Sequence, residues 1–244
     1  MRFVVVTLFP GVVEAYLNEG IVGRARARGL FSATTVDPRT YTSDRHRTVD
    51  DVPFGGGAGM VMKPEPVAQA IEAAGPVTRR VLLSPGGRPL TQADVQVFAG
   101  YESILLLCGR YEGIDDRVVQ RFIDEEVSLG DFVLSGGELA GLCLVDAVVR
   151  LLPGALGNAE SAENESFSHG LLEHPHYTRP ADWRDEGVPE VLLSGHHAEI
   201  DRWRRRESIR RTAMRRPEML QNVELTPDER RFVDALLVKE ESEK

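Results

Sequence analysis

Short apolar runs alternate with amphipathic stretches along the first 155 residues of the chain. The runs have the length and residue types of β-strands, whereas the stretches between them carry apolar residues at helical spacing. Strands that alternate with helices predict a parallel α/β sheet covered by helices on both faces. The expected strands are Phe3–Leu8, Phe31–Val36, Arg80–Ser84, Ile104–Cys108 and Phe132–Leu134.

Capping and breaking residues indicate where the helices of this region begin and end. Thr91 and Asp94 have the spacing of an N-terminal helix cap, and Pro153-Gly154 ends the last helix. The expected helices are Gly11–Leu17, Glu65–Ala73, Thr91–Ala99, Ile114–Phe122 and Glu138–Leu152.

The composition changes after residue 156, where a polar, acidic segment typical of a linker or a lid precedes arginine-rich helical sequence. Thr226 and Glu229, with a proline between them, form a helix-start signal, and His196 and His197 fit a second helix start. We expect an α/β domain over residues 1–156, a linker over 157–173 and a small helical domain over 174–244.

The charge distribution is uneven. The net charge of −9 argues against a generally basic nucleic-acid-binding protein. However, eight arginines and a single acid, Glu207, lie between Arg202 and Arg216, with Trp203 among them. Such a block can pair with phosphates and stack on bases, or it can be a solvated helix face. Taken alone, the block leaves both interpretations open.

The two cysteines, Cys108 and Cys143, both lie in apolar surroundings. We expect them to be buried free thiols of a cytoplasmic protein. No apolar run is long enough to span a membrane. Pro10 and Gly11 interrupt the first apolar run, which we therefore interpret as a core strand and not as a signal peptide.

Glycine-bearing loops follow apolar strands in residues 104–141. Glycine lets the main chain approach a ligand closely, and parallel sheets bind ligands at the carboxyl ends of their strands. The chain lacks both GxxxxGK[ST] and a GxGxxG that opens a helix. The loops therefore predict a pocket for a nucleoside-like cofactor without a pyrophosphate, and a nicotinamide-dependent oxidoreductase is disfavoured.

Two further segments carry candidate chemistry. Residues 43–63 form a long loop with three consecutive glycines, which fits either a binding loop or a flexible hinge. Arg150 ends an apolar helix, and Glu163 and Glu165 follow in the acidic segment, so reactive groups and a solvated linker are both open interpretations. The six histidines show no zinc-ligand spacing.

Six motifs and their order along the chain resemble those of the bacterial tRNA (guanine-N1)-methyltransferases. These enzymes belong to the SPOUT class of knotted methyltransferases. The resemblance covers nearly the whole chain. The motifs are SDRHRTVDDVPFGGGAGMVM, LLSPGGRPL, LLCGRYEGIDDRV, LGDFVLSGGELA, RLLPGALGN, and HPHYTRP followed by LLSGHHAEIDRWR.

The resemblance implies an activity and a cofactor site. The family transfers a methyl group from S-adenosylmethionine to N1 of guanosine 37 of tRNA, 3′ of the anticodon, when another guanosine precedes it. The N-terminal domain would carry a trefoil knot, and a homodimer would build each active site from both subunits. The implied cofactor contacts lie in three loops, Ser84–Gly87, Cys108–Gly113 and Leu129–Gly137. They are Pro85, Gly87, Gly109, Tyr111, Glu112, Leu129, Gly130, Phe132, Leu134, Gly136 and Gly137.

The resemblance also implies catalytic and RNA-binding residues. The family's catalytic arginine matches Arg150. The position of the family's catalytic aspartate holds Glu165, which keeps a carboxylate of similar intrinsic pKa, about 4.3 for glutamate against 3.9 for aspartate. Glu163 is the alternative base. A divalent ion such as Mg²⁺ is implied as well, although the sequence shows no metal cage. The implied RNA contacts are His46, Arg47, Asp50, Gly59, Ser161, Arg204, Arg205, Arg210 and Arg211.

Two other functions compete with this one. A knotted methyltransferase that acts on a different RNA position would share the cofactor loops, but not necessarily the 43–63 loop or the arginine block. A non-catalytic RNA-binding protein could keep the fold, but the presence of the cofactor loops together with Arg150 argues against it.

Overall fold

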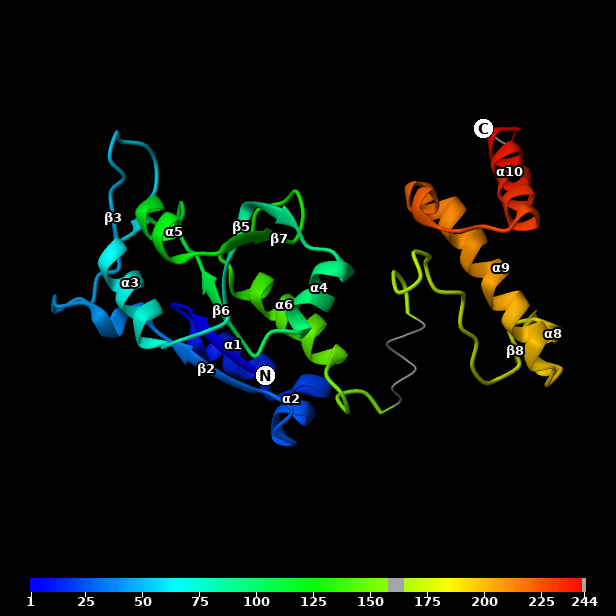
Figure 1. Ribbon diagram of the computed structural model, residues 1–244, viewed down its shortest axis with the longest axis horizontal. Helices are drawn as coiled ribbons and strands as arrows, with labels where there is room; N and C mark the ends of the chain where they lie inside the picture. Colours follow the sequence, from blue (N-terminus) through cyan, green and yellow to red (C-terminus); the bar gives the residue numbers. More distant parts are fainter. Residues whose placement is uncertain (158–164, 243–244) are drawn as a thin grey trace. The chain divides into compact units, whose positions relative to one another are not determined.

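The chain divides into two compact units, Met1–Ala159 and Glu160–Lys244. The computed structural model describes residues 1–157 and 165–242, and Figure 1 shows the elements of each unit. The candidate residues Ser161 and Glu163 lie outside the described residues. Each unit is described on its own below.

The first unit contains a five-stranded sheet in which all neighbouring strands are parallel, in the order β2-β1-β6-β5-β7. This confirms the predicted parallel α/β architecture. Beside the central strand β6, Val4 of β1 pairs with Thr34 of β2 on one side and with Leu105 of β6 on the other. The strands are β1 (Arg2–Val6), β2 (Ser32–Val36), β5 (Arg79–Pro89), β6 (Ser103–Cys108) and β7 (Glu125–Ser128).

Helices cover both faces of this sheet. One face packs against a core cluster to which α1, α2, α4 and α6 contribute, with Leu17, Phe98 and Val145 among its members. The other face packs against α3 and α5 through Ile71 and Val118. The helices are α1 (Pro10–Leu17), α2 (Gly20–Ala27), α3 (Pro64–Ala73), α4 (Gln92–Ala99), α5 (Asp116–Phe122) and α6 (Glu138–Leu151).

Local signals account for most of these boundaries. Thr91 and Asp94 form the predicted capping box at the start of α4. The helix expected from Ile114 instead begins at Asp116, because the Asp115 side chain accepts a hydrogen bond from the Arg117 amide and caps it there. Helix α2 was not predicted, since its arginines obscure the apolar stripe formed by Val22 and Ala25.

The predicted strand Phe132–Leu134 is wrong. These residues form an irregular loop, and Val133 is 82% exposed. The fifth strand is Glu125–Ser128 (β7), whose two glutamates hid it from a search for apolar runs. As an edge strand, β7 needs few apolar residues, and only Val127 and Ser128 of its residues are buried.

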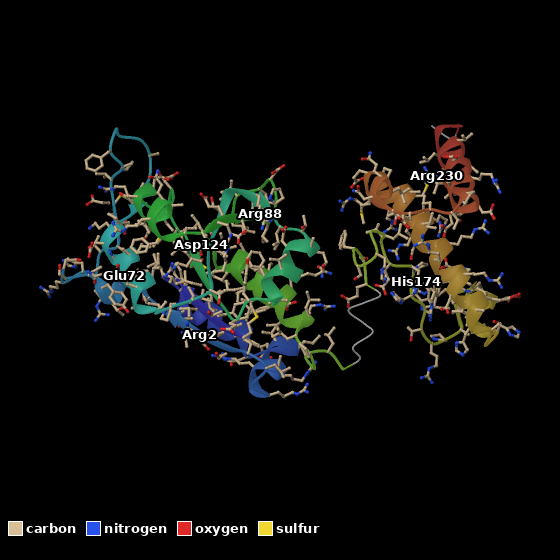
Figure 2. All side chains as sticks on the ribbon, in the orientation of Figure 1. Arg2, Glu72, Arg88, Asp124, His174 and Arg230 are labelled. Carbon is tan, nitrogen blue, oxygen red and sulfur yellow. The ribbon has the colours of Figure 1, made fainter. Side chains whose placement is uncertain are left out.

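Ion pairs fix this edge strand to its neighbours. Glu125 of β7 contacts Arg79 at 2.7 Å and Arg88 at 2.8 Å, and Arg88 also contacts Asp94 of α4 at 2.5 Å. The Asp124 side chain accepts a hydrogen bond from the Arg80 amide at 2.7 Å. Arg88 and Asp124 are labelled in Figure 2, which places both in the first unit. The network fixes the position from which the loop after β7 begins.

A short hairpin interrupts the long loop over residues 43–63. Strand β3 (Asp50–Asp51) pairs antiparallel with β4 (Val61–Met62), after a 3₁₀ turn, η1 (Pro38–Tyr41). The connection between β3 and β4 extends away from the sheet (Figure 1).

The second unit is mainly helical. Its small core contains Leu171, Ile209, Ala213 and Val233. Two predicted helix starts are confirmed: His197 opens α9, and Thr226 exchanges hydrogen bonds with Glu229 at the start of α10. The elements are β8 (Asp182–Trp183), β9 (Glu186–Gly187), α8 (Glu190–Leu193), α9 (His197–Arg215), η2 (Pro217–Asn222) and α10 (Pro227–Ser242).

The two cysteines differ in environment. Cys108 is buried in the sheet, as expected, whereas Cys143 is exposed on α6, so its predicted burial is wrong. Cys143 lies on the face of α6 that points away from the core residues Leu142 and Leu144. Within the described residues, no helix combines the length and apolar character that crossing a membrane requires.

Candidate active site

A cleft with a volume of about 390 Å³ lies at the carboxyl ends of β5, β6 and β7. Its walls are formed by residues 82–85 within β5 and by the loops that follow β6 and β7, in keeping with ligand binding at the carboxyl ends of parallel strands. Ten of the eleven predicted cofactor contacts line the cleft, all except Gly87. The ten are Pro85, Gly109, Tyr111, Glu112, Leu129, Gly130, Phe132, Leu134, Gly136 and Gly137.

Close backbone approaches explain why glycines occupy the floor of the cleft. The Gly137 amide donates a hydrogen bond to the Gly109 carbonyl at 2.9 Å. A Cβ atom on Gly137 would lie 2.8 Å from the Cα of Cys108, and one on Gly136 would lie 2.1 Å from Arg110 Nε. A side chain on Gly137 would therefore separate the two loops, whereas one on Gly136 would displace the Arg110 side chain.

Gly87 has a structural role beside the cleft. Strand β5 shifts its register against β7 between Leu83 and Arg88. A Cβ atom on Gly87 would lie 2.4 Å from the backbone nitrogen of Val127. The missing side chain thus lets the irregular part of β5 pass directly against β7.

A buried ion pair lies behind the cleft wall. Arg110 Nη2 is 2.9 Å from Glu138 Oε2, and the Glu138 side chain is only 2% exposed. Thr7 Oγ1 donates a hydrogen bond to the other carboxylate oxygen at 2.7 Å, and Arg110 Nη1 donates one to the Ser135 carbonyl at 3.0 Å. The Arg110 guanidinium also lies over the ring of Phe9. The sequence offered one signal for this cluster, the single carboxylate of Glu138 at the start of an apolar helix.

The cleft lining is asymmetric in charge. Among the described residues that line it, Arg110 is the one basic side chain, whereas Glu112, Asp116 and Glu126 are acidic. Such a lining favours a ligand with net positive charge. Burial, together with the negative charge of Glu138, raises the pKa of the Cys108 thiol, so this cysteine stays protonated.

Tyr111 connects the cleft to the 43–63 loop. Its backbone has a positive φ of 60°, which is uncommon for a residue with a side chain. Burial and the nearby carboxylate of Asp50 raise the pKa of its hydroxyl. Asp50, a predicted RNA contact, therefore lies beside a residue that lines the cleft.

Backbone hydrogen bonds attach the same loop to the cleft. The Glu112 amide donates to the Met60 carbonyl, and the Met62 amide donates to the Gly113 carbonyl, both at 2.9 Å. A Cβ atom on Gly59 would lie 2.3 Å from Glu112 Oε1. Gly59 thus needs its lack of a side chain in order to approach Glu112.

The predicted RNA contacts His46 and Arg47 lie in an exposed turn of this loop. The Asp44 side chain closes the turn by accepting hydrogen bonds from the amides of His46 and Thr48 and from the Thr48 hydroxyl. Hydrogen bonds from Thr48, with smaller contributions from other amides, lower the pKa of Asp44. The turn therefore has a fixed shape and presents both side chains to solvent.

The two predicted catalytic residues belong to different units. Arg150 lies half-buried in the last turn of α6. Glu165 is half-buried in the second unit, where it lines a cavity of about 580 Å³ together with His169, His174 and Arg204.

The arginine block is largely paired with acidic side chains. Arg204 contacts Asp201 at 3.3 Å, Arg205 contacts Glu229 at 2.9 Å and Arg210 contacts Glu207 at 2.5 Å. Arg211 has no ion pair within the described part of the chain. Three of the four predicted arginine contacts therefore have an intramolecular partner that RNA phosphates would have to replace or share.

The family resemblance implies a divalent ion, which would need a cluster of oxygen, nitrogen or sulfur ligands. Among residues 1–157 and 165–242, no three His, Cys, Asp or Glu side chains are arranged to hold a metal ion. The described residues therefore do not form a site that fits such an ion.

The parallel sheet and the glycine-lined cleft define an α/β protein that binds its ligand at the carboxyl ends of its strands. Comparison with known proteins makes the class specific. Residues 1–222 match the family described as tRNA (Guanine-1)-methyltransferase TrmD. The chain belongs to this family, whose fold is the knotted SPOUT fold, and the resemblance seen in the sequence is confirmed.

Relatives of similar length support this membership. A tRNA (guanine-N(1)-)-methyltransferase of Pseudomonas entomophila (strain L48) is 51% identical over 241 residues, covering 97% of this chain and 96% of that protein. One from Anaeromyxobacter sp. (strain K) is 53% identical over 236 residues, 95% of each chain. One from Geotalea uraniireducens (strain Rf4) is 49% identical over 239 residues, 97% of each chain.

Proposed function

We propose that this protein transfers a methyl group from S-adenosylmethionine to N1 of guanosine 37 in tRNAs in which a guanosine precedes that position. One observation carries the proposal: a chain that matches the tRNA (guanine-1)-methyltransferase family over residues 1–222 has a glycine-lined cleft at the place where the donor contacts were expected. A tRNA substrate assigns the reaction to the cytoplasm.

The cleft of the first unit is the proposed donor site. When bound, S-adenosylmethionine supplies an electrophilic methyl group on a positively charged sulfur. The acidic side chains of Glu112, Asp116 and Glu126 favour such a cation in the cleft. Gly109 and Gly137 line this cleft, and the missing Cβ atom of Gly137 lets the two cleft loops approach each other closely enough to form the site.

Glu165 and Arg150 are the proposed catalytic residues. Guanine N1 carries a proton and is a poor nucleophile until that proton leaves. In the proposed mechanism the Glu165 carboxylate accepts the N1 proton, and the Arg150 guanidinium stabilises the negative charge that develops on O6. Glutamate is one methylene longer than the family's aspartate, so the segment that carries it must position the carboxylate about 1 Å further back.

The 43–63 loop is the proposed guanosine-recognition element. The Asp50 carboxylate accepts a hydrogen bond from the exocyclic amine of the guanine, whose N1–H is left to Glu165. His46 and Arg47 approach the RNA from the exposed turn, and Gly59 lets the RNA approach the backbone. Ser161 and the arginine block, Arg211 above all, contact the tRNA from the second domain.

A homodimer with composite sites is part of the proposal. Helices α1 and α6 pack together, and the Tyr16 hydroxyl donates a hydrogen bond to Asp146 at 2.5 Å. Around this contact, Val12, Tyr16 and Leu139 expose large apolar area. A second copy of the chain would cover this face. In this arrangement residues 1–156 of one subunit hold the donor, and residues 157–173 and 174–244 of its partner close over the tRNA.

Mass-spectrometric mapping of the methylated base tests the function. The protein is incubated with S-adenosylmethionine and tRNA transcripts that carry or lack the guanosine before position 37. We expect a single 1-methylguanosine at position 37 in the first transcript only. Methylation at another RNA position would identify a different knotted methyltransferase. A calorimetric titration with S-adenosylmethionine that releases no heat would indicate a protein that only binds RNA.

A further inference from the structure

One large apolar side chain of the first unit has no contact that shields it from water. Phe54 is 100% exposed, at the tip of the connection between β3 and β4. Isolated surface hydrophobics are common, but complete exposure of a phenyl ring on a projecting tip is not. The ring presents both of its faces to solvent.

The backbone around Phe54 has a defined shape. Gly55, Gly56 and Gly57 all have positive φ values, a region that residues with side chains rarely adopt. Nothing lies within 4 Å of a Cβ atom built on any of the three. The glycines are therefore required by the conformation of the turn and not by crowding, and they leave the ring without neighbouring side chains.

The base of this tip is fixed beside the donor cleft. Asp50 pairs with Met62 in the β3–β4 hairpin. The Met62 amide donates to the Gly113 carbonyl, and Asp115 in turn donates its amide to the Met62 carbonyl. The tip thus begins at the cleft wall and extends away from the sheet (Figure 1).

We propose that Phe54 stacks on an unpaired base of the anticodon loop next to the guanosine that is methylated. This inference rests on the proposed function and adds a contact that positions the RNA. Three exposed basic side chains, Arg45, His46 and Arg47, lie in the same loop and suit the phosphates on either side of such a base. A stacked base needs only one ring face, whereas a protein partner needs a larger contiguous apolar patch than Val52, which is 70% exposed, and Pro53 add beside the ring.

Kinetics and binding of two variants test the proposal. Phe54→Ala is expected to raise the Km for tRNA and the Kd for an anticodon stem-loop RNA by about tenfold, the effect of losing one base–aromatic stack. The Kd for S-adenosylmethionine should stay unchanged. Phe54→Trp should bind the RNA at least as well as the native protein, and its fluorescence should be quenched by the RNA.

Abasic RNA identifies the stacked base. When single bases of the stem-loop are removed in turn, the tenfold penalty of Phe54→Ala should disappear for one position next to the guanosine and persist for the others. Val97→Ala, at a side chain that is 60% exposed on α4, is the matched control and should change neither constant. Sedimentation of each variant reports whether the subunits stay together.

Three results would overturn the proposal. The first is native-like RNA binding by Phe54→Ala. The second is a loss of RNA affinity in Phe54→Ala that no abasic position removes. The third is dissociation of the subunits by Phe54→Ala, which would assign the ring to a contact with a second copy of the chain. None of these results changes which base is methylated, so failure here is distinguishable from failure of the proposed methyl transfer.

Discussion

Arg110 and Glu138 form an ion pair of 2.9 Å that joins two walls of the glycine-lined cleft, because Arg110 lies in the loop after β6 and Glu138 follows the loop after β7. Thr7 adds the end of β1 to the same cluster. Three chain segments that are distant in sequence thus meet at one buried carboxylate. The pair holds the cleft loops at a fixed separation.

Removing one partner of this pair should cost more than removing both. Arg110→Met leaves the Glu138 carboxylate buried without its cation, and we expect a loss of about 3 kcal/mol in the free energy of unfolding. Arg110→Met combined with Glu138→Gln removes the buried charge and should recover most of that loss. Urea denaturation measures both.

Calorimetric titration with S-adenosylmethionine then separates the effect of the ion pair on stability from its effect on the position of the cleft loops. The double variant should still bind the donor more weakly than the native protein, because the loops are no longer joined. A double variant that binds the donor as tightly as the native protein would show that the pair does not hold the loops. Arg110→Lys, which keeps the charge, is the conservative control.

The space at Gly137 gives a second prediction. Its φ of −78° is ordinary, so any cost of a side chain there arises from contact with the Cys108 backbone and not from conformation. Gly137→Ala is expected to destabilise the protein by about 2 kcal/mol or more and to abolish donor binding.

Gly11→Ala is the matched control for this variant. Gly11 lies in α1, and nothing lies within 4 Å of a Cβ atom built on it. An alanine there should be neutral or stabilise the helix by up to about 1 kcal/mol. Equal effects of the two substitutions on the free energy of unfolding would contradict the crowding at Gly137.

The sequence predicted the parts of the site that depend on periodicity and on glycine. Apolar runs located four strands of the sheet, and the loops that contain Gly109 and Gly136 line the cleft at the carboxyl ends of the strands. These features depend on local sequence: a buried strand must be apolar, and a close backbone approach requires a missing side chain.

Features that depend on tertiary partners were not predicted. The strand β7 contains two glutamates, and one of them, Glu125, is neutralised by Arg79 and Arg88 from a distant segment. The partners of Arg205 and Glu138 likewise lie 24 and 28 residues away in the chain. Spacing along the sequence carries no record of such pairs, because the fold alone brings them together.

Replacing the proposed base tests the chemistry. Glu165→Gln keeps the size of the side chain but cannot accept the N1 proton, so kcat should fall by at least about 100-fold with little change in the Kd for S-adenosylmethionine. Arg150→Ala should lower kcat similarly, because the charge on O6 would lose its cation. Single-turnover methyl transfer measures both.

Glu165→Asp is the informative control. It restores the carboxylate of the family with one methylene less, and we expect it to retain measurable turnover. Near-native kcat in Glu165→Gln would remove Glu165 from the role of base and direct attention to Glu163.

The arginines of α9 should separate into two groups. Arg211, which has no ion pair among the described residues, is expected to contact phosphate, so Arg211→Ala should weaken tRNA binding and reduce the slope of log K against log salt by about one. Arg205→Ala should mainly destabilise the second domain, since Arg205 pairs with Glu229. Equal salt slopes for Arg211→Ala and the native protein would exclude a phosphate contact.

The pH dependence of stability should reveal the contacts of Glu229. Hydrogen bonds from Arg205, with further ones from Thr226, lower the pKa of this carboxyl. A carboxyl whose pKa is lower in the folded protein stabilises it above the unfolded-state value, about 4.3, and loses that contribution as the pH falls through the lower folded value. Glu229→Gln should therefore cost about 1–2 kcal/mol at pH 7. The difference from the native protein should narrow below about pH 4.3 and close as the native carboxyl becomes protonated.

Thermal unfolding of the native protein and Glu229→Gln between neutral and acidic pH measures this difference. Asp228→Asn is the control, because Asp228 is exposed and its contact with Arg231 lies on the surface of α10. Such surface pairs contribute at most about 1 kcal/mol, so its unfolding curve should stay near the native one throughout. A Glu229→Gln difference that persists unchanged at low pH would mean that packing at the start of α10, and not the carboxylate charge, holds this helix against α9.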